Sequence, residues 1–552
     1  MFSKVTSGSI YGIECVLTQV EVDIAKTMPA FDMVGMLSGE VKEAKERVRV
    51  ALKNAGINLP PVHITVNLSP ADIRKEGTAY DLPIAVGILV SLGHIPKEYV
   101  EGVCIIGELG LNGEVKPVKG VLPIVKEAAV QGIRVCILPF ENVREGSVIE
   151  GITIVGVKDF GEVVKYFDAS KEKMGRLDFF DCVKVCEGTA CDDDRVKGMS
   201  PAGDAAKAQE DWPATEDVRE ESVEQMFEKA LDMVEDFEDI AGQEVCKRAA
   251  LIAAAGFHHM LITGPPGAGK TMIARRMPGI LPPLTLEESL EVSSIYSVSG
   301  LLNKEQCLIT SRPFLAPHHT TTVTTLAGGG SIPRPGLFSL CHRGVLFLDE
   351  LPEFSRECIE VMRQPLEEKK IQIARTQGTY VYPADFMLVA ASNPCPCGYY
   401  PDRGRCHCSE REIRRYQNKI SGPIRDRIDL NVTAQMIDIG QLNGKRGRLS
   451  SAMLRKMVMQ ARKRQEERFQ GTHLRFNSDI SSREISKYCP LGEEENEYME
   501  KVFHMLKLSA RSYHKLLKVA RTIADVEGDE KILVRHLAEA VNYRVQEEAV
   551  YV

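Results

Sequence analysis

Residues 264–271 read Gly264-Pro265-Pro266-Gly267-Ala268-Gly269-Lys270-Thr271. This run is a complete G-x-x-x-x-G-K-[ST] phosphate-binding loop, and it follows the apolar residues 260–262, which are typical of a buried strand. The glycines let main-chain N–H groups approach phosphates, and a helix that begins near Lys270 directs its positive end at them. We therefore expect ATP to bind here, with Thr271 as a Mg²⁺ ligand. Taken alone, the pattern also fits a glycine-rich turn between a strand and a helix.

Two further apolar runs end in polar residues that suit the same chemistry. Residues 344–348 are followed by Asp349 and Glu350, and residues 386–391 are followed closely by Asn393. In a P-loop enzyme, Asp349 would hold the metal and Glu350 would orient or deprotonate the attacking water. Asn393 would polarise the same water from the neighbouring strand. The plain alternative for the acid pair is a buried strand that ends in solvated acids.

Length and composition exclude several classes of protein. At 552 residues, of which 44% are hydrophobic, the chain has material for more than two packed domains. No apolar run reaches the ~20 residues that span a bilayer, and the first residues lack a long apolar signal segment. The 15 cysteines, scattered and odd in number, fit a reducing compartment. We therefore expect a cytoplasmic protein that does not engage a membrane.

The negative charge of the chain is concentrated in one segment. Residues 192–239 contain 17 acidic and 5 basic residues, a net charge of -12, whereas the whole chain has -8 and the remainder therefore +4. The overall acidity does not exclude a basic surface or pore elsewhere.

Periodicity and composition divide the chain into four parts. Residues 1–168 predict an α/β domain, with a helix over 41–55, a strand over 62–68 and an Asn-Gly hairpin within 107–115. Residues 169–230 are acidic and rich in small residues, which indicates a flexible linker. Residues 231–440 hold the nucleotide motifs. Residues 441–552 have the pattern of a small helical lid.

Several motifs occur in an order that resembles one family. They are DFEDIAGQ at 236–243, APHHT at 316–320, GGG at 328–330, CHRGVLFLDEL at 341–351 and NPCPCG at 393–398. In this order they resemble the magnesium-chelatase-like AAA+ ATPases of the ComM/YifB family over nearly the whole chain. The resemblance implies an AAA+ P-loop core with a mostly parallel sheet, a helical lid and assembly into a homo-hexamer.

The same resemblance implies two arginines that complete the ATP site. The segment 422–429 matches the arginine finger, with Arg427 reaching the γ-phosphate of a neighbouring subunit. Arg425 stands where the family pattern has an apolar residue, so the finger could instead be Arg425. Arg511, in the first turn of an apolar-periodic helix, resembles the second sensor, a phosphate-facing cation. The plain alternative for the segment 422–429 is a set of surface arginines after a strand.

A segment that faces the ring pore in relatives carries the expected DNA contacts. Residues 371–382 alternate around a Gln-Gly turn, and residues 320–336 resemble the family's inserted pore loop. The basic candidates for phosphate contact are Lys369, Lys370 and Arg375. Tyr380 or Tyr382 would stack on bases, as in single-strand channels. A solvated edge hairpin is the alternative. The two histidines before the loop, residues 318 and 319, either pack there or take part in the chemistry.

Four cysteines form the one tight cluster in the sequence. Cys395, Cys397, Cys406 and Cys408 are spaced C-x-C-x8-C-x-C around a turn-rich segment, and four thiolates suit a tetrahedral Zn²⁺. Each pair has one intervening residue rather than the commoner two, and His407 offers a substitute ligand. We expect a structural zinc ion; core or free thiols are the alternative.

The N-terminal domain resembles the Lon protease fold. The matching segments are 75–85 and 107–120. A Ser-Lys protease needs both a nucleophile and a base, and here Ala79 stands at the serine position and Leu122 near the lysine position. We therefore expect a domain that lacks protease activity.

The resemblance implies an ATP-driven DNA motor, similar to ComM helicases that promote branch migration during natural transformation. Its partners would be single-stranded or branched DNA and recombination proteins, and its cofactors ATP, Mg²⁺ and Zn²⁺. A chelatase-type motor that inserts Mg²⁺ into a porphyrin is one alternative. An ATP-dependent protein remodeller or protease is another, opposed by Ala79.

Overall fold

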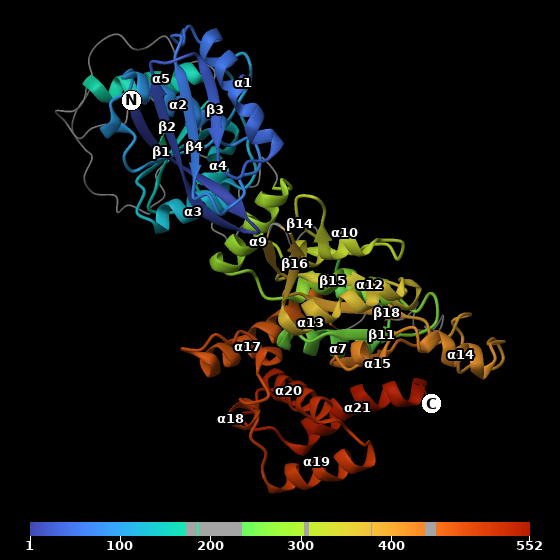
Figure 1. The fold of residues 1–552 in the computed structure, drawn as a ribbon. Helices are drawn as coiled ribbons and strands as arrows, with labels where there is room; N and C mark the ends of the chain where they lie inside the picture. Colours follow the sequence, from blue (N-terminus) through green and yellow to red (C-terminus); the bar gives the residue numbers. More distant parts are fainter. Residues whose placement is uncertain (173–184, 187–234, 303–307, 377, 437–448, 552) are drawn as a thin grey trace. The chain divides into compact units, whose positions relative to one another are not determined.

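The computed structural model describes residues 1–172, 185–186, 235–302, 308–376, 378–436 and 449–551. The chain divides into two compact units (Figure 1). The first unit consists of Met1–Asp217, Ser289–Ile309 and Ala374–Tyr380, and the second of Val218–Glu288, Thr310–Ile373 and Val381–Val552. The predicted linker, residues 169–230, lies outside the described residues except for the end of one helix and a two-residue strand. Among the described residues, no helix combines the length and apolarity needed to cross a bilayer.

The first unit is built on an eight-stranded sheet of order β10-β9-β8-β5-β1-β2-β4-β3. Its strands are β1 (Phe2–Tyr11), β2 (Glu14–Ala25), β3 (Ala30–Val34), β4 (His63–Ser69), β5 (Val103–Ile105), β8 (Val135–Pro139), β9 (Thr153–Val157) and β10 (Val185–Cys186). Its helices are α1 (Gly39–Asn54), α2 (Asp81–Leu92), α3 (Val121–Val130), α4 (Val143–Gly146) and α5 (Phe160–Glu172).

Local sequence signals account for several of these elements. Helix α1 buries Val41, Ala44 and Val48 on one face, as its apolar spacing predicts. The Asn-Gly hairpin is present as β6 (Glu108–Leu109) and β7 (Val115–Lys116), which pair antiparallel. Helix α2 is apolar except for Asp81 and Ser91, as expected of a helix that is buried along nearly all of its length.

The second unit contains a fully parallel five-stranded sheet of order β12-β15-β18-β11-β19. Its strands are β11 (Met260–Thr263), β12 (Phe314–Leu315), β15 (Val345–Leu348), β18 (Met387–Ser392) and β19 (Leu430–Thr433). Two small antiparallel pairs are β13 (Gly328–Gly329) with β14 (Arg334–Pro335) and β16 (Lys370–Arg375) with β17 (Gly378–Pro383). The central strands are buried at every position, which fits their continuous apolar sequences.

Helices surround this sheet and continue into the C-terminal region. Those of the nucleotide-binding part are α7 (Glu244–Gly256), α8 (Lys270–Arg276), α10 (Val323–Ala327), α11 (Leu337–Leu340), α12 (Arg356–Val361), α13 (Arg363–Glu368), α14 (Glu410–Gln417) and α15 (Gly422–Arg425). Helix α9 (Leu286–Ser299) is divided between the two units. The C-terminal helices are α17 (Ser451–Phe469), α18 (Ile485–Tyr488), α19 (Glu493–Met505), α20 (Ala510–Glu527) and α21 (Val534–Tyr551), drawn in orange and red in Figure 1.

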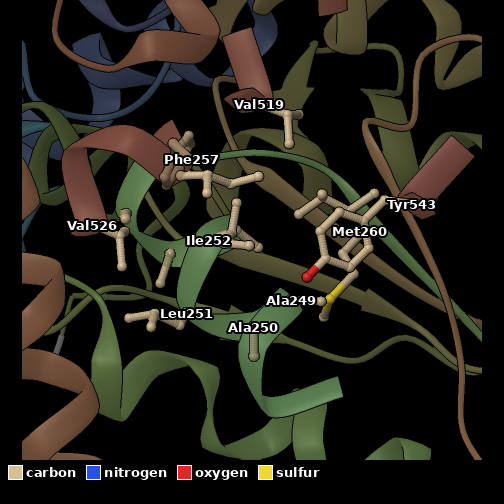
Figure 2. Close-up of a cluster of buried hydrophobic side chains, with 14 of the residues drawn as sticks. Ala249, Ala250, Leu251, Ile252, Phe257, Met260, Val519, Val526 and Tyr543 are labelled. Atoms are coloured by element: carbon tan, nitrogen blue, oxygen red, sulfur yellow. The ribbon is translucent and has the colours of Figure 1, made fainter. Parts of the chain in front are cut away.

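The C-terminal helices share one hydrophobic core with the sheet. Figure 2 shows Ile252 and Phe257 from α7 and its end near Met260 of β11, together with Val519 of α20 and Tyr543 of α21. All five side chains are buried. The helical region therefore packs as part of the nucleotide-binding unit through apolar contacts that the sequence periodicity of α20 predicts.

Candidate active site

Three strand ends meet at the carboxyl edge of the parallel sheet. Thr263 at the end of β11 pairs with Ser392 at the end of β18, and Leu348 at the end of β15 pairs with Ala390. The phosphate-binding loop follows β11, the acid pair follows β15 and Asn393 follows β18. Ligands of parallel α/β sheets bind beyond this edge. The fold therefore brings together the groups that the three motifs predict.

The phosphate-binding loop has a backbone that needs its glycines. Gly267 and Gly269 have φ angles of 79° and 83°, in the left-handed region that favours glycine. A Cβ atom on Gly264 would lie 2.5 Å from the carbonyl oxygen of Ala434, so a side chain there would collide with the main chain after β19. Helix α8 begins directly after Gly269, so its first N–H groups face the loop.

Lys270 is held inside the loop by three hydrogen bonds. Its Nζ donates to the carbonyl oxygens of Gly264 at 2.6 Å and Pro265 at 3.0 Å, and to Oδ1 of Asn393 at 2.9 Å. Burial lowers the pKa of Lys270, and the charges of Asp349 and Glu350 oppose this shift. The lysine thus links the loop to the end of β18.

The oxygen atoms beside the loop suit a magnesium ion. Thr271 donates its hydroxyl to Oδ2 of Asp349 at 2.9 Å, which puts two hard oxygen ligands from α8 and β15 in contact. Together with the glycine-rich loop and the Lys270 ammonium, they form a donor set that fits a nucleoside triphosphate with Mg²⁺. Thr271 and Asp349 would hold the metal.

Glu350 stands next to this pair and is accessible to water. Its backbone is left-handed, with a φ of 51°, and its side chain is 51% exposed. Nδ1 of His319 lies 3.9 Å from its Oε2. This contact could not be predicted from the sequence, because His319 follows a different strand, β12. The contact adds a titratable neighbour to the carboxylate that is expected to activate water.

The two predicted arginines meet at one carboxylate of the same chain. Arg427 and Arg511 both form ion pairs with Glu367, Arg511 at 3.3 Å. Within the described residues, neither has a hydrogen bond or ion pair with residues 264–271. The hydrogen bond from Arg427 is the largest cause that lowers the pKa of Glu367. Arg425 instead donates to the carbonyl of Gln417 at 2.6 Å.

The four clustered cysteines lie close enough together to share one metal ion. Sγ of Cys395 lies 3.3 Å from that of Cys397 and 3.7 Å from that of Cys406, and the four sulfur atoms, including that of Cys408, lie within 4.8 Å of one another. Zinc bound at about 2.3 Å to each sulfur would place them about 3.8 Å apart. The cluster thus fits Zn²⁺ through four thiolates, and the exposed His407 is outside it.

One thiol of the cluster ionises easily. Burial raises the pKa of Cys397, but hydrogen bonds from the main chain at Tyr399 and from the neighbouring thiols outweigh it and lower the pKa to about 6. Thiolates are the form that binds zinc. A Cβ atom on Gly398 would lie 2.7 Å from Cδ of Pro266, so the cysteine segment packs against the phosphate-binding loop.

The two tyrosines of the hairpin of β16 and β17 are not placed as the expected stacking on bases requires. The Tyr380 ring is stacked on Tyr11, with ring centroids 4.7 Å apart, and the Tyr382 hydroxyl donates to the carbonyl of Pro333 at 2.8 Å. Both rings are buried, so the expectation that they stack on bases is wrong for this conformation. Alternation along β17 points these two residues to the same face, which the protein itself covers.

Of the three basic candidates for DNA contact, one is already paired. Lys369 forms ion pairs with Asp385 and Asp479, which makes it a link within the second unit rather than a free cation. Lys370 is half-buried and Arg375 is exposed. These two remain candidates for phosphate contact.

The two positions that match the serine and the lysine of a Lon-type protease hold residues that make structural contacts. The carbonyl of Ala79 accepts a hydrogen bond from the Gly107 N–H at 3.0 Å. Leu122 is fully buried, and its N–H donates to Oε1 of Glu145 at 3.0 Å. The chain thus provides neither a serine nor a lysine at the two matching positions.

The sheet order and the three polar strand ends define the second unit as an AAA+ P-loop domain. Three family models match the chain. The model described as magnesium chelatase, subunit ChlI, matches residues 236–442, and the model described as subunit ChlI of Mg-chelatase matches residues 20–142. The model of the C-terminal region of magnesium chelatase subunit ChlI matches residues 448–544. Competence protein ComM of Haemophilus influenzae is 38% identical over 98% of this chain and 97% of its own. YifB of Salmonella typhimurium is 38% identical over 97% of this chain and 95% of its own.

The chain belongs to the magnesium-chelatase-like ComM/YifB family. The family implies ATP and Mg²⁺ as ligands. Lon protease 2 of Bacillus subtilis is 35% identical over 22% of this chain and 22% of its own, which agrees with a Lon-like fold in part of the protein.

Proposed function

We propose that the protein is an ATP-driven, ring-forming motor that acts on single-stranded or branched DNA in the cytoplasm. The observation that carries the proposal is the convergence of Lys270, Thr271, Asp349, Glu350 and Asn393 at one edge of the parallel sheet. Within such a site, ATP hydrolysis supplies the energy for movement. A role in DNA recombination during natural transformation follows from the family relationship.

Each residue of the site has a separate task in the proposed hydrolysis. The Lys270 ammonium would neutralise charge on the phosphates, and the loop N–H groups would orient them. Glu350, accessible to water, would orient a water molecule and accept its proton. Asn393 would polarise that water from the end of β18. Bound Mg²⁺ would supply stabilisation of the charge that develops on the phosphate oxygens.

The position of the two arginines supports assembly into a ring. Arg427 and Arg511 meet at Glu367 and, in the described part of the chain, form no hydrogen bond or ion pair with their own phosphate-binding loop. Arginines that act on a γ-phosphate are often supplied by a neighbouring molecule. Glu367 would hold both arginines until the phosphates of a nucleotide bound to a neighbouring subunit replace its carboxylate as their partner. A hexamer is the form that the family relationship favours.

The substrate is the second part of the proposal. The name of the Haemophilus relative, competence protein, favours DNA. The family models are named after magnesium chelatase, which keeps a chelatase-type motor as the second candidate. Ala79 at the nucleophile position opposes a protease.

One comparison of substrates separates these functions. The purified protein is incubated with ATP and Mg²⁺ and, in parallel, with forked DNA, with a porphyrin and with casein. We expect strand separation or branch migration of the DNA, no metal insertion and intact casein. Metal insertion without action on DNA would favour the chelatase, and ATP-dependent cleavage of casein would show that the domain is an active protease.

A further inference from the structure

Helix α14 carries an exposed basic face that the phosphate-binding site does not use. Arg411, Arg414 and Arg415 are exposed, and their spacing of three and four residues places them on one side of the helix. The buried residues of α14, Ile413, Tyr416 and Gln417, lie on the opposite side. The three arginines therefore project together into solvent.

The acidic residues of the helix do not neutralise these arginines. Glu410 forms an ion pair with Arg403, and Glu412 closes the capping box with Ser409. Within the described residues, no ion pair involves any of the three arginines. Like charges three and four residues apart repel each other and destabilise a helix. An anion bound along this face would remove that repulsion.

The cysteine cluster packs against the buried side of helix α14. Ile413 packs in one hydrophobic cluster with Cys395 and Cys406. The same segment touches the phosphate-binding loop through Gly398 and Pro266. A metal held by the cysteines would thus fix the orientation of the arginine face, and the segment gives that face a physical connection to the nucleotide.

We propose that Arg411, Arg414 and Arg415 form a binding surface for the phosphate backbone of DNA. The proposal rests on the proposed function and adds a contact surface outside the hairpin. The arginines stand side by side over about one helical turn, 5.4 Å, instead of converging on one point. That arrangement suits successive phosphates of a polymer better than a single phosphate, and guanidinium groups are the preferred cations for phosphate oxygens.

The test removes the three arginine charges of α14 and compares the effect on DNA binding with that of removing three basic charges from another helix. The variant is Arg411→Ala/Arg414→Ala/Arg415→Ala in the full-length chain. The control is Lys42→Ala/Lys45→Ala/Arg49→Ala on α1, where all three residues are also exposed. Fluorescence anisotropy measures the affinity for labelled single-stranded and forked DNA over a range of salt concentrations, with ATP hydrolysis without DNA measured in parallel.

We expect the α14 variant to bind DNA at least tenfold more weakly, with the slope of log affinity against log salt reduced by about 2 on a single strand, about 0.7 per lost contact. The control variant should keep the wild-type slope, and both should keep the rate of hydrolysis without DNA. Replacement of the three arginines by lysines should restore most of the slope, because the slope depends on charge.

Three outcomes would overturn the proposal. The α14 variant could keep the affinity and slope of the control, or it could lose hydrolysis without DNA, which would assign the arginines to a neighbour's ATP site. It could also lose ring assembly, which would assign them to a protein interface. If the wild-type protein bound no DNA, the proposed function itself would fail; equal binding by wild type, control and variant would reject this surface alone.

Discussion

Among the residues of the site, Glu350 is expected to act in ATP hydrolysis but not in ATP binding. Its carboxylate is exposed beside Asp349, whereas Lys270 and Thr271 make the contacts that would hold phosphate and metal. Glu350→Gln keeps the size of the side chain and removes the base. We expect ATP hydrolysis to fall by about 100-fold or more, since a positioned base contributes about 10²–10⁴-fold.

The same variant should still bind ATP, because no contact to the phosphates is removed. Lys270→Ala should lose both binding and hydrolysis. Glu353→Gln is the matched control, because this nearby glutamate pairs with Lys419 at 3.1 Å and is not expected to act on water. Equilibrium binding of a fluorescent ATP analogue and steady-state phosphate release measure the two properties. Wild-type turnover in Glu350→Gln would reject the assignment of the base.

The meeting of these residues at one edge of the sheet could be predicted from the sequence, because each motif is local. The loop, the acid pair and Asn393 each stand directly after an apolar strand, and parallel strands end at one edge. The pairing of Lys369 with Asp479 and the stacking of Tyr380 on Tyr11 could not be predicted, because these partners lie far apart in the sequence. Local patterns contain no information on such long-range pairs.

The cysteine segment is the element whose stability depends most directly on a ligand. The sulfur atoms lie at the separations that a tetrahedral zinc site requires, and Ile413 packs on them. We expect about one zinc ion per chain in protein purified under reducing conditions without chelator. Removal of zinc should lower the thermal stability, because the ion binds the folded segment.

Metal analysis and thermal unfolding measure these two effects. Cys395→Ser should lower the zinc content. Cys246→Ala, which removes a buried thiol outside the cluster, should leave it unchanged. A wild-type protein without zinc would show that the four thiols serve only packing.

A largely buried ion pair joins the two arginine-bearing elements. Asp429, two residues after Arg427, forms an ion pair with Lys515 of α20 at 2.6 Å and accepts a hydrogen bond from the His259 N–H at 3.0 Å. Burial alone would raise the pKa of Asp429, but the Lys515 charge and the contact with His258 hold it well below the usual value. Helix α20 also carries Arg511, so this pair fixes both arginines near Glu367.

Asp429→Asn should therefore destabilise the protein by about 3–5 kcal/mol at neutral pH, because it leaves Lys515 buried without a charged partner. A carboxylate whose pKa is lowered on folding contributes stability above its unfolded pKa, about 3.9, and loses it as the pH falls through the folded pKa. The difference between wild type and variant should thus narrow below about pH 4.

Urea unfolding at several pH values measures this difference. Asp426→Asn is the control, because Asp426 is half exposed and its separation from Arg544 is 4.0 Å. The control should change the stability by less than about 0.5 kcal/mol. Equal effects of the two substitutions would show that the Asp429 pair is not a stabilising contact.

For the whole molecule, the position of the arginines leads us to expect that neighbouring subunits cooperate in ATP hydrolysis. Arg427→Ala should bind ATP but hydrolyse it poorly, since arginines of this kind contribute about 10³–10⁵-fold. Mixing it with Lys270→Ala should restore part of the activity, because an intact Arg427 from one chain would then meet an intact loop of another. Co-purification of the two variants through different affinity tags verifies that mixed rings form. Mixed rings without recovered hydrolysis would contradict the action of Arg427 between subunits.

Changes in periodicity along the sequence indicate an N-terminal α/β part, a P-loop core and C-terminal helices. They do not show that the C-terminal helices share one core with the sheet, as Phe257 and Val519 do. Periodicity shows which face of a helix is apolar, but the partner of that face is chosen by tertiary packing.

ATP turnover measured without and with forked DNA is the most direct test of whether the site hydrolyses ATP to move DNA. We expect steady hydrolysis by the wild-type protein that rises with DNA concentration to a plateau, and no comparable hydrolysis by Glu350→Gln at any DNA concentration. Turnover that does not change when DNA is added, or that persists in Glu350→Gln, would contradict it.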